Sequence, residues 1–400
     1  MLGFSFVMPF LPDFLEKLGI EDRRKLLVWA GLTGAAPAWT MFIFAPIWGV
    51  VADKIGRKAM VMRAMFGGFV IIGMMGFAKT PLMLFMLRVL QGSITGTVPA
   101  SNALVSSVTP AKRASFTLGI MQAAVHAGHL LGPLIGGYAA DVLGYRRTFF
   151  IAASLLLAGG FLVLFCADEG PAHPRELVKL KAANGGGGLM EVLRQPGFAV
   201  LVGITFTAAF SRMVLSPIFL PYVKTLIPPG STMIKTITGS LIATTAASTM
   251  ITAVVGGRLA DRYGPKIFLV GGTMLAGAFC IPQAFVGGVS QLYALRVMIG
   301  IGTGMVAPAI GGLVNRLVPR ESQGKAFGLL QSSSSLGIGL APVTGGFIGA
   351  NFGMTAAFVF TGSFQICVGV LALILLALLP AHVRNGNGGG EEKVPPEEGG

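Results

Sequence analysis

GVVADKIGRK occupies residues 49–58, and GRLADRYGPK, nearly the same charged decapeptide, occupies residues 257–266. The two copies lie 208 residues apart, and Arg88 in LRVLQGSITG matches Arg296 in LRVMIGIGTG at the same offset. Several prolines and glycines recur at an offset of 208 or 209. Self-similarity at one fixed spacing indicates that the chain contains two copies of one structural unit.

The composition places both units in lipid. Only 12% of the 400 residues are charged, against roughly a quarter in a soluble protein, and the mean hydropathy is +0.76. We therefore predict an all-α polytopic membrane protein of twelve transmembrane helices. Apolar runs long enough to cross a bilayer cover 26–52, 59–78, 82–108, 115–140, 147–167, 196–221, 236–260, 267–287, 290–314, 326–350 and 355–379, with a shorter first run at 2–18.

The repeat divides these helices into two six-helix bundles, 1–167 and 196–379, joined by a linker at 168–195 and followed by a disordered tail at 380–400. Six is an even number, so both bundles have the same orientation and are related by a pseudo-two-fold axis along the membrane normal, with a binding site between them. Helix 1 is expected to be shortened, because residues 2–18 reach only about 25 Å at 1.5 Å per residue.

The net charge of +14 reflects topology rather than nucleic-acid binding. If 53–58 lies inside the cell, the connections and ends on that side carry 18 of the 30 Lys and Arg residues, and the opposite side carries nine. This bias puts the linker and the C-terminus in the cytoplasm. The three cysteines are isolated, and no GK[ST] follows the NGGGG run of the linker, so we expect no metal, no cofactor and no nucleotide site.

GVVADKIGRK resembles the loop 2–3 motif of the major facilitator superfamily, and GRLADRYGPK its weaker second copy. RVLQG at 88–92 is similar to the helix 4 motif, and GHLLGPLIGG at 128–137 resembles the helix 5 motif GxxxGPxxGG of the antiporters. Within the superfamily, the chain most resembles bacterial drug:proton antiporters of the tetracycline and multidrug exporter type. The resemblance implies a monomer in the bacterial inner membrane.

The resemblance also implies a cytoplasmic gate. Asp53 would face the start of helix 11 near Lys325, and Arg57 would support it. The second copy departs from the pattern at Pro265, which makes unequal gates the expectation. A plain topology anchor is the alternative for such a basic turn. The full predicted gate set is Gly49, Asp53, Gly56, Arg57, Lys58, Asp261 and Gly264.

The helix 5 motif is expected to bend that helix at the seam between the bundles. Pro133 removes one backbone hydrogen bond and favours a bend, whether the motif serves export or only helix packing. Its members are Gly128, Gly132, Pro133, Gly136 and Gly137.

Charges inside the helices cost on the order of 3 kcal/mol or more, so they are candidates for function. Asp13 and Arg88 lie at similar depths in helices 1 and 4, and we expect them to pair and couple protons; a solvated helix end is the alternative for Asp13. His126, at mid-depth in helix 5, is a second candidate for proton transfer because histidine titrates near neutrality.

Arg212 lies in the middle of helix 7, and no carboxylate of matching depth is visible in the sequence. An unpaired buried guanidinium favours an anionic or zwitterionic ligand, or else contacts backbone carbonyls. We predict that Arg212 lines the substrate cavity together with Gln91, Asn102 and Gln122.

The function predicted from the sequence is proton-coupled export of small apolar or amphipathic molecules, such as drugs, by alternating access. The alternatives are a symporter or facilitator for a sugar or organic anion, and a receptor that uses the same fold without transport. An enzyme would need a nucleophile and base, or metal ligands, clustered at one depth, and the sequence shows none. The expected partners are a small-molecule substrate, protons and the bilayer.

Overall fold

The structure, a computed structural model, describes residues 2–7, 10–108, 114–167, 194–195, 197–228, 231–318 and 323–377. All regular secondary structure in these residues is helical, as predicted. The N-terminal half contains α1 (Leu2–Ser5), α2 (Leu11–Lys17), α3 (Arg23–Ile55), α4 (Arg57–Gly76), α5 (Pro81–Ile94), α6 (Thr97–Val108), α7 (Ala114–Val142) and α8 (Tyr145–Cys166).

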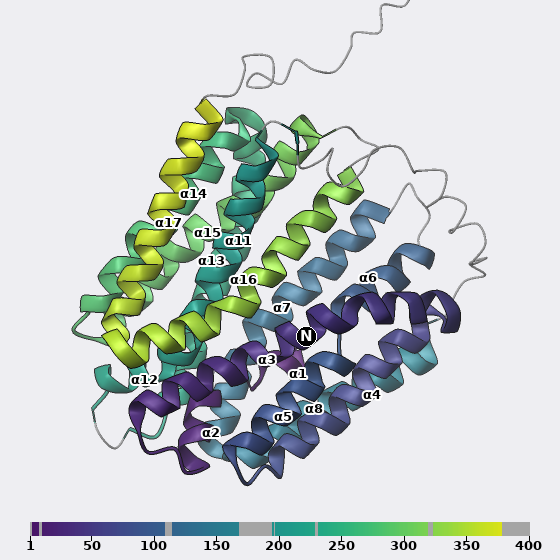
Figure 1. Cartoon of the computed structure of the whole chain (residues 1–400), viewed down its shortest axis with the longest axis vertical. Coiled ribbons are helices and arrows are strands. Elements are labelled where there is room, and N and C mark those ends of the chain that lie inside the picture. Colours follow the sequence, from purple (N-terminus) through teal and green to yellow (C-terminus); the bar gives the residue numbers. More distant parts are fainter. Residues whose placement is uncertain are drawn as a thin grey trace, which may run out of the picture.

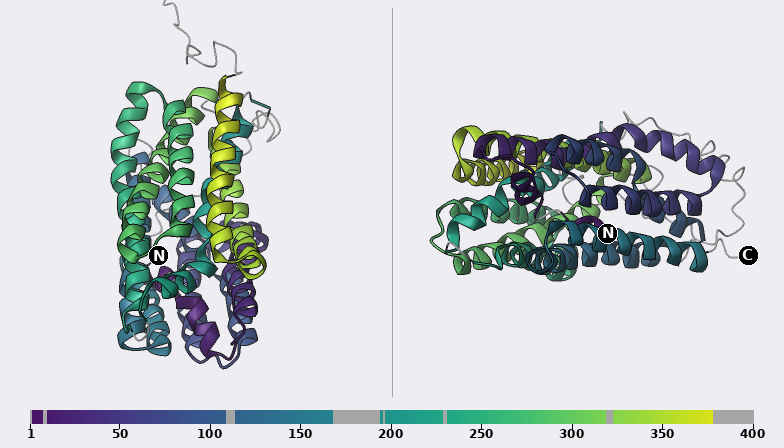
Figure 2. Two further views of the ribbon diagram at one scale, coloured as in Figure 1. Left: turned by 90° about the vertical axis from the view of Figure 1, so that its left-hand side faces the viewer. Right: turned by 90° about the horizontal axis from the view of Figure 1, so that it is seen from below.

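The C-terminal half contains a matching series. Figure 1 shows it in teal to yellow at the upper left, with the N-terminal half in purple to blue at the lower right. In the view from below, the two groups again lie side by side (Figure 2). The helices are α11 (Phe198–Val214), α12 (Ser216–Leu226), α13 (Ile234–Tyr263), α14 (Pro265–Cys280), the 3-10 helix η3 (Ile281–Phe285), α15 (Val289–Leu317), α16 (Gln323–Phe352) and α17 (Met354–Ala377).

Seven described helices are long and apolar enough to span a membrane by themselves. An eighth span is formed if α11 and α12, which bend by 44°, count as one. Pro217 lies in the first turn of α12, where its fixed φ and missing N–H are tolerated. The predicted total of twelve stays a prediction, and the predicted linker and tail lie outside the described residues apart from 194 and 195.

The repeated decapeptide forms the same sharp turn in both halves. Gly56 has a φ of 106° and precedes α4, and Gly264 has a φ of 93° and precedes α14. Such positive φ values are readily available only to glycine. The glycine of the repeated motif is thus required by the turn that reverses the chain between two long helices.

Equivalent helix contacts recur in the two halves. A β-carbon at Gly92 would collide with the carbonyl oxygen of Pro37, and one at Gly300 would collide with that of Thr245. Likewise, Gly136 packs on the Phe6 carbonyl as Gly345 packs on that of Val214. The residues of each contact in one half correspond to those of the other half at an offset of 208 or 209. The sequence repeat is therefore also a structural repeat.

The halves meet along two seams, and at each seam a glycine allows two helix backbones to approach closely. Along α3 and α16, a β-carbon at Gly31 would collide with the carbonyl oxygen of Pro342; along α7 and α13, one at Gly239 would collide with that of Pro133. These two contacts are again related by the repeat. Small residues let helix backbones approach closely in lipid, where the hydrophobic effect does not drive helices together.

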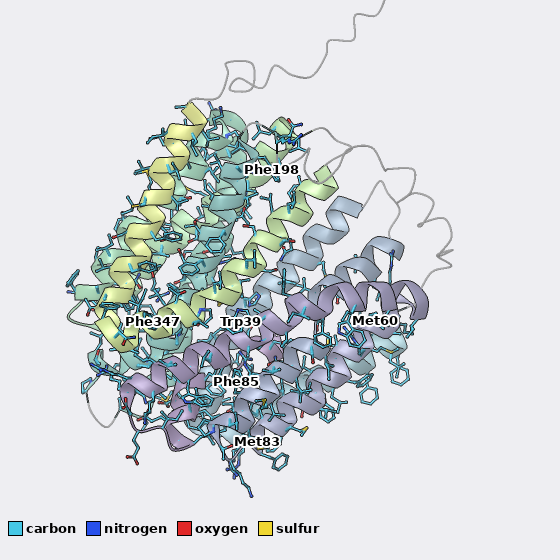
Figure 3. The ribbon with its side chains drawn as sticks, viewed as in Figure 1. Trp39, Met60, Met83, Phe85, Phe198 and Phe347 are labelled. Atoms are coloured by element: carbon cyan, nitrogen blue, oxygen red, sulfur yellow. The ribbon has the colours of Figure 1, made fainter. Side chains whose placement is uncertain are left out.

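The bundles separate along the seams toward one end. Trp39 of α3 packs over Gly339 of α16, at the crossing of the two helices (Figure 3). One turn further along the same face, Ile43 is 61% exposed, and Ser332, two turns before Gly339, is also exposed. We call the end that holds α2 and α12 the closed end, and the end that holds the α3–α4 turn the open end.

Each half has its own apolar core. In the N-terminal bundle, Phe10 and Phe149 are fully buried against each other, with ring centroids 5.9 Å apart. In the C-terminal bundle, Phe198 and Leu201 are fully buried with α14 and α15 side chains. The two cores meet only locally, because Leu220 of α12 joins the N-terminal cluster and Leu27 of α3 joins a second C-terminal cluster.

We predict that Gly239→Ala destabilises the protein by about 1–3 kcal/mol, because the new methyl group must displace the backbone at Pro133. Gly271→Ala is the matched control, since nothing lies within 4 Å of its added β-carbon. Thermal unfolding of the purified protein in detergent measures both effects. Equal unfolding temperatures for the two variants would contradict the seam as described.

Candidate functional site

Charged side chains and one tyrosine from the two bundles contact each other at the closed end. The gate cluster, as we call it, consists of Asp13, Glu16, Asp141, Tyr145, Lys224 and Lys235. Lys224 of α12 contacts Asp13 of α2, and its Nζ lies 2.8 Å from the Glu16 carboxylate. Because the ammonium group belongs to one bundle and both carboxylates to the other, these ion pairs exist only while the closed end stays closed.

Asp141, near the end of α7, accepts hydrogen bonds from the start of α13. One oxygen accepts from the backbone N–H of Thr236 at 2.6 Å and from its hydroxyl at 2.7 Å, and the other lies 2.9 Å from Lys235 Nζ. The Asp141 side chain is 1% exposed. A carboxylate that accepts from the first turn of a helix satisfies its free N–H groups, so one bundle caps a helix of the other.

Tyr145 links the gate cluster to the N-terminal core. Its hydroxyl donates to the Asp13 carboxylate, and its ring lies 5.6 Å from that of Phe10. Lys235 Nζ lies 3.9 Å from the same Asp13 oxygen, Oδ2, and 5.1 Å from the Tyr145 ring centroid, whereas Lys224 contacts Oδ1. Asp13 is thus buried among a hydroxyl and two ammonium groups, and both ammonium groups come from the other bundle.

Arg212 faces away from the outer helix of its own bundle. Phe210 points toward α17, with its ring 5.5 Å from that of Phe364, and two positions later a helical side chain projects about 200° further round. Figure 1 places α17 on the side of the C-terminal bundle farthest from the N-terminal one. The Arg212 side chain is exposed and has no hydrogen bond or ion pair within the described part of the chain. It therefore projects toward the space between the bundles.

The sequence model described as Major Facilitator Superfamily matches residues 1–224 and 201–398. The chain belongs to the major facilitator superfamily. The predicted fold class is thereby confirmed, and the chain is a multi-pass transporter that acts on small molecules. The matched ranges reach across both repeats.

Relatives within the superfamily carry drug-efflux names. Multidrug resistance protein MdtG of Proteus mirabilis (strain HI4320) is 32% identical over 366 residues, covering 90% of this chain and 89% of that protein. The multi-drug resistance efflux pump PmrA homolog of Lactococcus lactis subsp. lactis (strain IL1403) is also 32% identical, covering 91% and 89%. A solved bacterial homolog of the human lysosomal transporter Spinster, 16% identical, superposes with a TM-score of 0.76 over 94% of each chain and shows the same fold.

The predicted ion pair between Asp13 and Arg88 is wrong. Asp13 is held by the gate cluster, whereas Arg88 donates from Nε to the Thr33 carbonyl at 3.1 Å and from Nη1 to Gln91 at 2.8 Å. Similar depth did not imply contact, because Arg88 is directed from α5 toward α3. Gln91 is buried in that hydrogen bond, which also corrects its predicted place on the cavity wall.

The superfamily gate motif lies at the open end. The predicted Asp53 contact with the start of helix 11 stays a prediction. Lys58 Nζ donates to the Leu164 carbonyl of α8 at 2.8 Å. The side chains of Asp53, Lys325 and Asp261 lie outside the described part.

The helix 5 motif lies on both sides of a seam. Gly132 packs on Ser5 and Gly136 on the Phe6 carbonyl, both in the same bundle, whereas Gly137 packs on the Lys235 carbonyl of the other bundle. Pro133 lies inside α7, which is continuous from Ala114 to Val142, and its carbonyl packs on Gly239 at the α7–α13 seam. The predicted bend stays a prediction.

Three further predicted residues lie in helices without described side chains: Asn102, Gln122 and His126. The neighbouring His129 is described, and its Nδ1 lies 3.0 Å from the Ser5 hydroxyl. No group of three metal-ligating side chains occurs among the described residues.

Sequence reasoning missed five members of the gate cluster: Glu16, Asp141, Tyr145, Lys224 and Lys235. One signal was available, because Lys224 is the repeat equivalent of Glu16, and the two pair across the pseudo-two-fold axis. Opposite charges at one repeat position predict such a contact. Nothing comparable in the sequence marked Asp141 or Lys235.

We expect Asp141→Asn to destabilise the protein by about 3 kcal/mol, because the amide nitrogen would face hydrogen-bond donors in a buried site. Glu16→Gln serves as the control. Its carboxylate is 51% exposed, so its loss should cost less than about 1 kcal/mol. Denaturant unfolding in detergent compares the two. The inter-bundle cap is refuted if the Asp141 variant is as stable as the Glu16 variant.

Proposed function

We propose that this transporter exports small amphipathic molecules in exchange for protons by alternating access. The observation that carries the proposal is the gate cluster, in which buried carboxylates of one bundle pair with ammonium groups of the other. The drug-efflux names of its relatives support export. We further propose that the protein works as a monomer in the bacterial inner membrane.

The proposed orientation places the closed end outside the cell. The bias of Lys and Arg toward the opposite side supports this choice. The central linker and the C-terminus are then cytoplasmic, and the described conformation is open to the cytoplasm. In the other conformation, the gate set around Asp53, Gly56 and Arg57 would close the open end against α16.

Proton coupling follows from the position of Asp13 between the bundles. While the closed end is shut, its ion pair with Lys224 requires an ionised carboxylate. Opening that end removes Lys224 and exposes Asp13 to the outside, where it can take up a proton. Closure brings Lys224 back and expels the proton toward the cytoplasmic cavity. A group whose surroundings differ between two conformations couples its protonation to their equilibrium.

Arg212 is the proposed contact for the polar part of the substrate. An exposed guanidinium without a partner at mid-membrane depth is costly, and a negatively charged group would offset that cost through charge-assisted hydrogen bonds. The apolar part of a substrate would meet Trp39, which is 40% exposed near the end of the seam contacts. An importer of organic anions would use the same arginine, so the direction of flux separates the two functions.

The proton step is tested in proteoliposomes with a fluorescent drug, an imposed acid step and an internal pH dye. Asp13→Asn should lower gradient-driven drug flux by about tenfold, within the usual range for coupling between two sites, while drug-for-drug exchange persists. Glu16→Gln is the control and should keep its coupling. Parental drug and proton fluxes in Asp13→Asn would remove Asp13 from the mechanism, and drug movement with the protons would identify a symporter.

Arg212→Gln should lower export of an anionic compound by about tenfold relative to a neutral analogue of the same size, because one hydrogen bond to a charged group contributes about 1.5–3 kcal/mol. The comparison uses matched compounds in the same vesicles. Arg146→Gln, at an exposed arginine of the closed end, controls for the change in charge. If Arg212→Gln exports both compounds as well as the parent does, Arg212 does not bind the substrate.

A further inference from the structure

The two seams end differently at the closed end. On the α7–α13 seam, Asp141 and Lys235 form an ion pair. On the α3–α16 seam, the repeat equivalents of these residues are Ala350 and Leu27, which cannot pair, and a cavity of about 540 Å³ lies there instead. The cavity is lined by both bundles. It therefore occupies the position where the other seam has its charged link.

The first turn of α3 supplies cations to this cavity. Arg23 and Arg24 line it, and Lys25 follows; all three are exposed, and none forms an ion pair within the described residues. Arg23 Nη2 only reaches the sulfur of Met354, at 3.4 Å. The closed end is on the side predicted to hold fewer Lys and Arg residues. The positive-inside rule therefore does not explain three consecutive cations there.

The two acidic residues beside these three cations neutralise them only in part. Asp22 turns back to the helix and accepts from the backbone N–H groups of Arg24 at 2.7 Å and Lys25 at 3.2 Å. These two backbone hydrogen bonds lower the pKa of Asp22, and the nearby charges of Lys25 and Arg24 lower it further. Glu21 is exposed and precedes the helix. The guanidinium groups keep N–H donors for an external anion.

An apolar groove adjoins the cavity. It has a volume of about 230 Å³, shares Arg24, Ala350 and Asn351 with the first cavity, and is also lined by Lys25, Val28 and Trp29. Val28 is 38% exposed, and tryptophan is enriched at the membrane–water boundary. Cations at that boundary above an apolar groove match a molecule with an anionic head and a hydrocarbon chain.

We propose that this cavity binds the headgroup of an anionic phospholipid from the leaflet at the closed end. The guanidinium groups of Arg23 and Arg24 hold the phosphate, which their planar donor arrays fit, and one acyl chain lies in the groove beside Val28 and Trp29. The lipid contacts α3 of one bundle and α12 and α16 of the other, so it holds the closed end shut on the seam that lacks an ion pair. This inference does not depend on the proposed proton exchange.

The test compares lipid retention by the full-length protein. Protein is reconstituted in nanodiscs of phosphatidylglycerol and phosphatidylethanolamine, extracted into detergent, and its bound lipids are counted by native mass spectrometry. The Arg23→Gln/Arg24→Gln variant should retain about tenfold less phosphatidylglycerol than the parent, with phosphatidylethanolamine unchanged. The control is Arg146→Gln/Arg147→Gln, an adjacent exposed pair that begins α8 at the same end and lines neither cavity; it should retain as much as the parent.

A second measurement covers the case in which the double variant folds poorly. Phosphatidylglycerol should raise the thermal unfolding temperature of the parent, and inorganic phosphate should not. The proposal is overturned by equal phosphatidylglycerol retention in the Arg23/Arg24 variant and the parent, or by equal losses in both double variants. Protection of the parent by inorganic phosphate equal to that by phosphatidylglycerol would also overturn it, because the site would then bind a free anion.

Discussion

The close approach of glycine to a proline carbonyl at two repeat-related seams is the contact on which the arrangement of the bundles depends. Gly31 meets Pro342, and Gly239 meets Pro133. Burying apolar side chains gives helices little reason to associate in lipid, so van der Waals contact between backbones must supply the attraction. At the points of closest approach these seams have no glycine side chain that interlocks with the facing helix. They can therefore separate at one end while they stay in contact at the other, which alternating access requires.

Charged contacts make the two otherwise similar seams different. The two halves pack alike, but the gate cluster occupies one seam and the pseudo-two-fold axis, and the other seam has a cavity. The duplicated unit has thus kept its backbone contacts and diverged in its polar ones. Backbone contacts constrain every conformation of the transporter, whereas an ion pair across a gate stabilises only one. Divergence that placed Lys224 against the buried Asp13 gives that stabilisation without changing the packing.

The sequence predicted the parts of the structure that depend on local geometry. The turn glycines Gly56 and Gly264 and the long helices follow from spacing and backbone chemistry. The contacts of Asp13 and Arg88 were missed because helix depth can be counted along the chain, but the direction of a side chain round its helix depends on the neighbours that pack there. The open or closed state of each end was not predictable either, because one sequence must encode both states.

The buried arginines show why charge in a membrane helix is not itself a sign of function. Arg88 is satisfied inside its bundle by the Thr33 carbonyl and Gln91, and its repeat equivalent Arg296 lies 3.8 Å over the ring of Phe219. Neither contact crosses a seam, so neither has to change when the bundles move. The gate cluster crosses a seam, and Arg212 faces the space between the bundles. A charge can respond to transport only if its surroundings change during the cycle, and among these residues that condition selects Asp13 and Arg212 rather than the better buried Arg88.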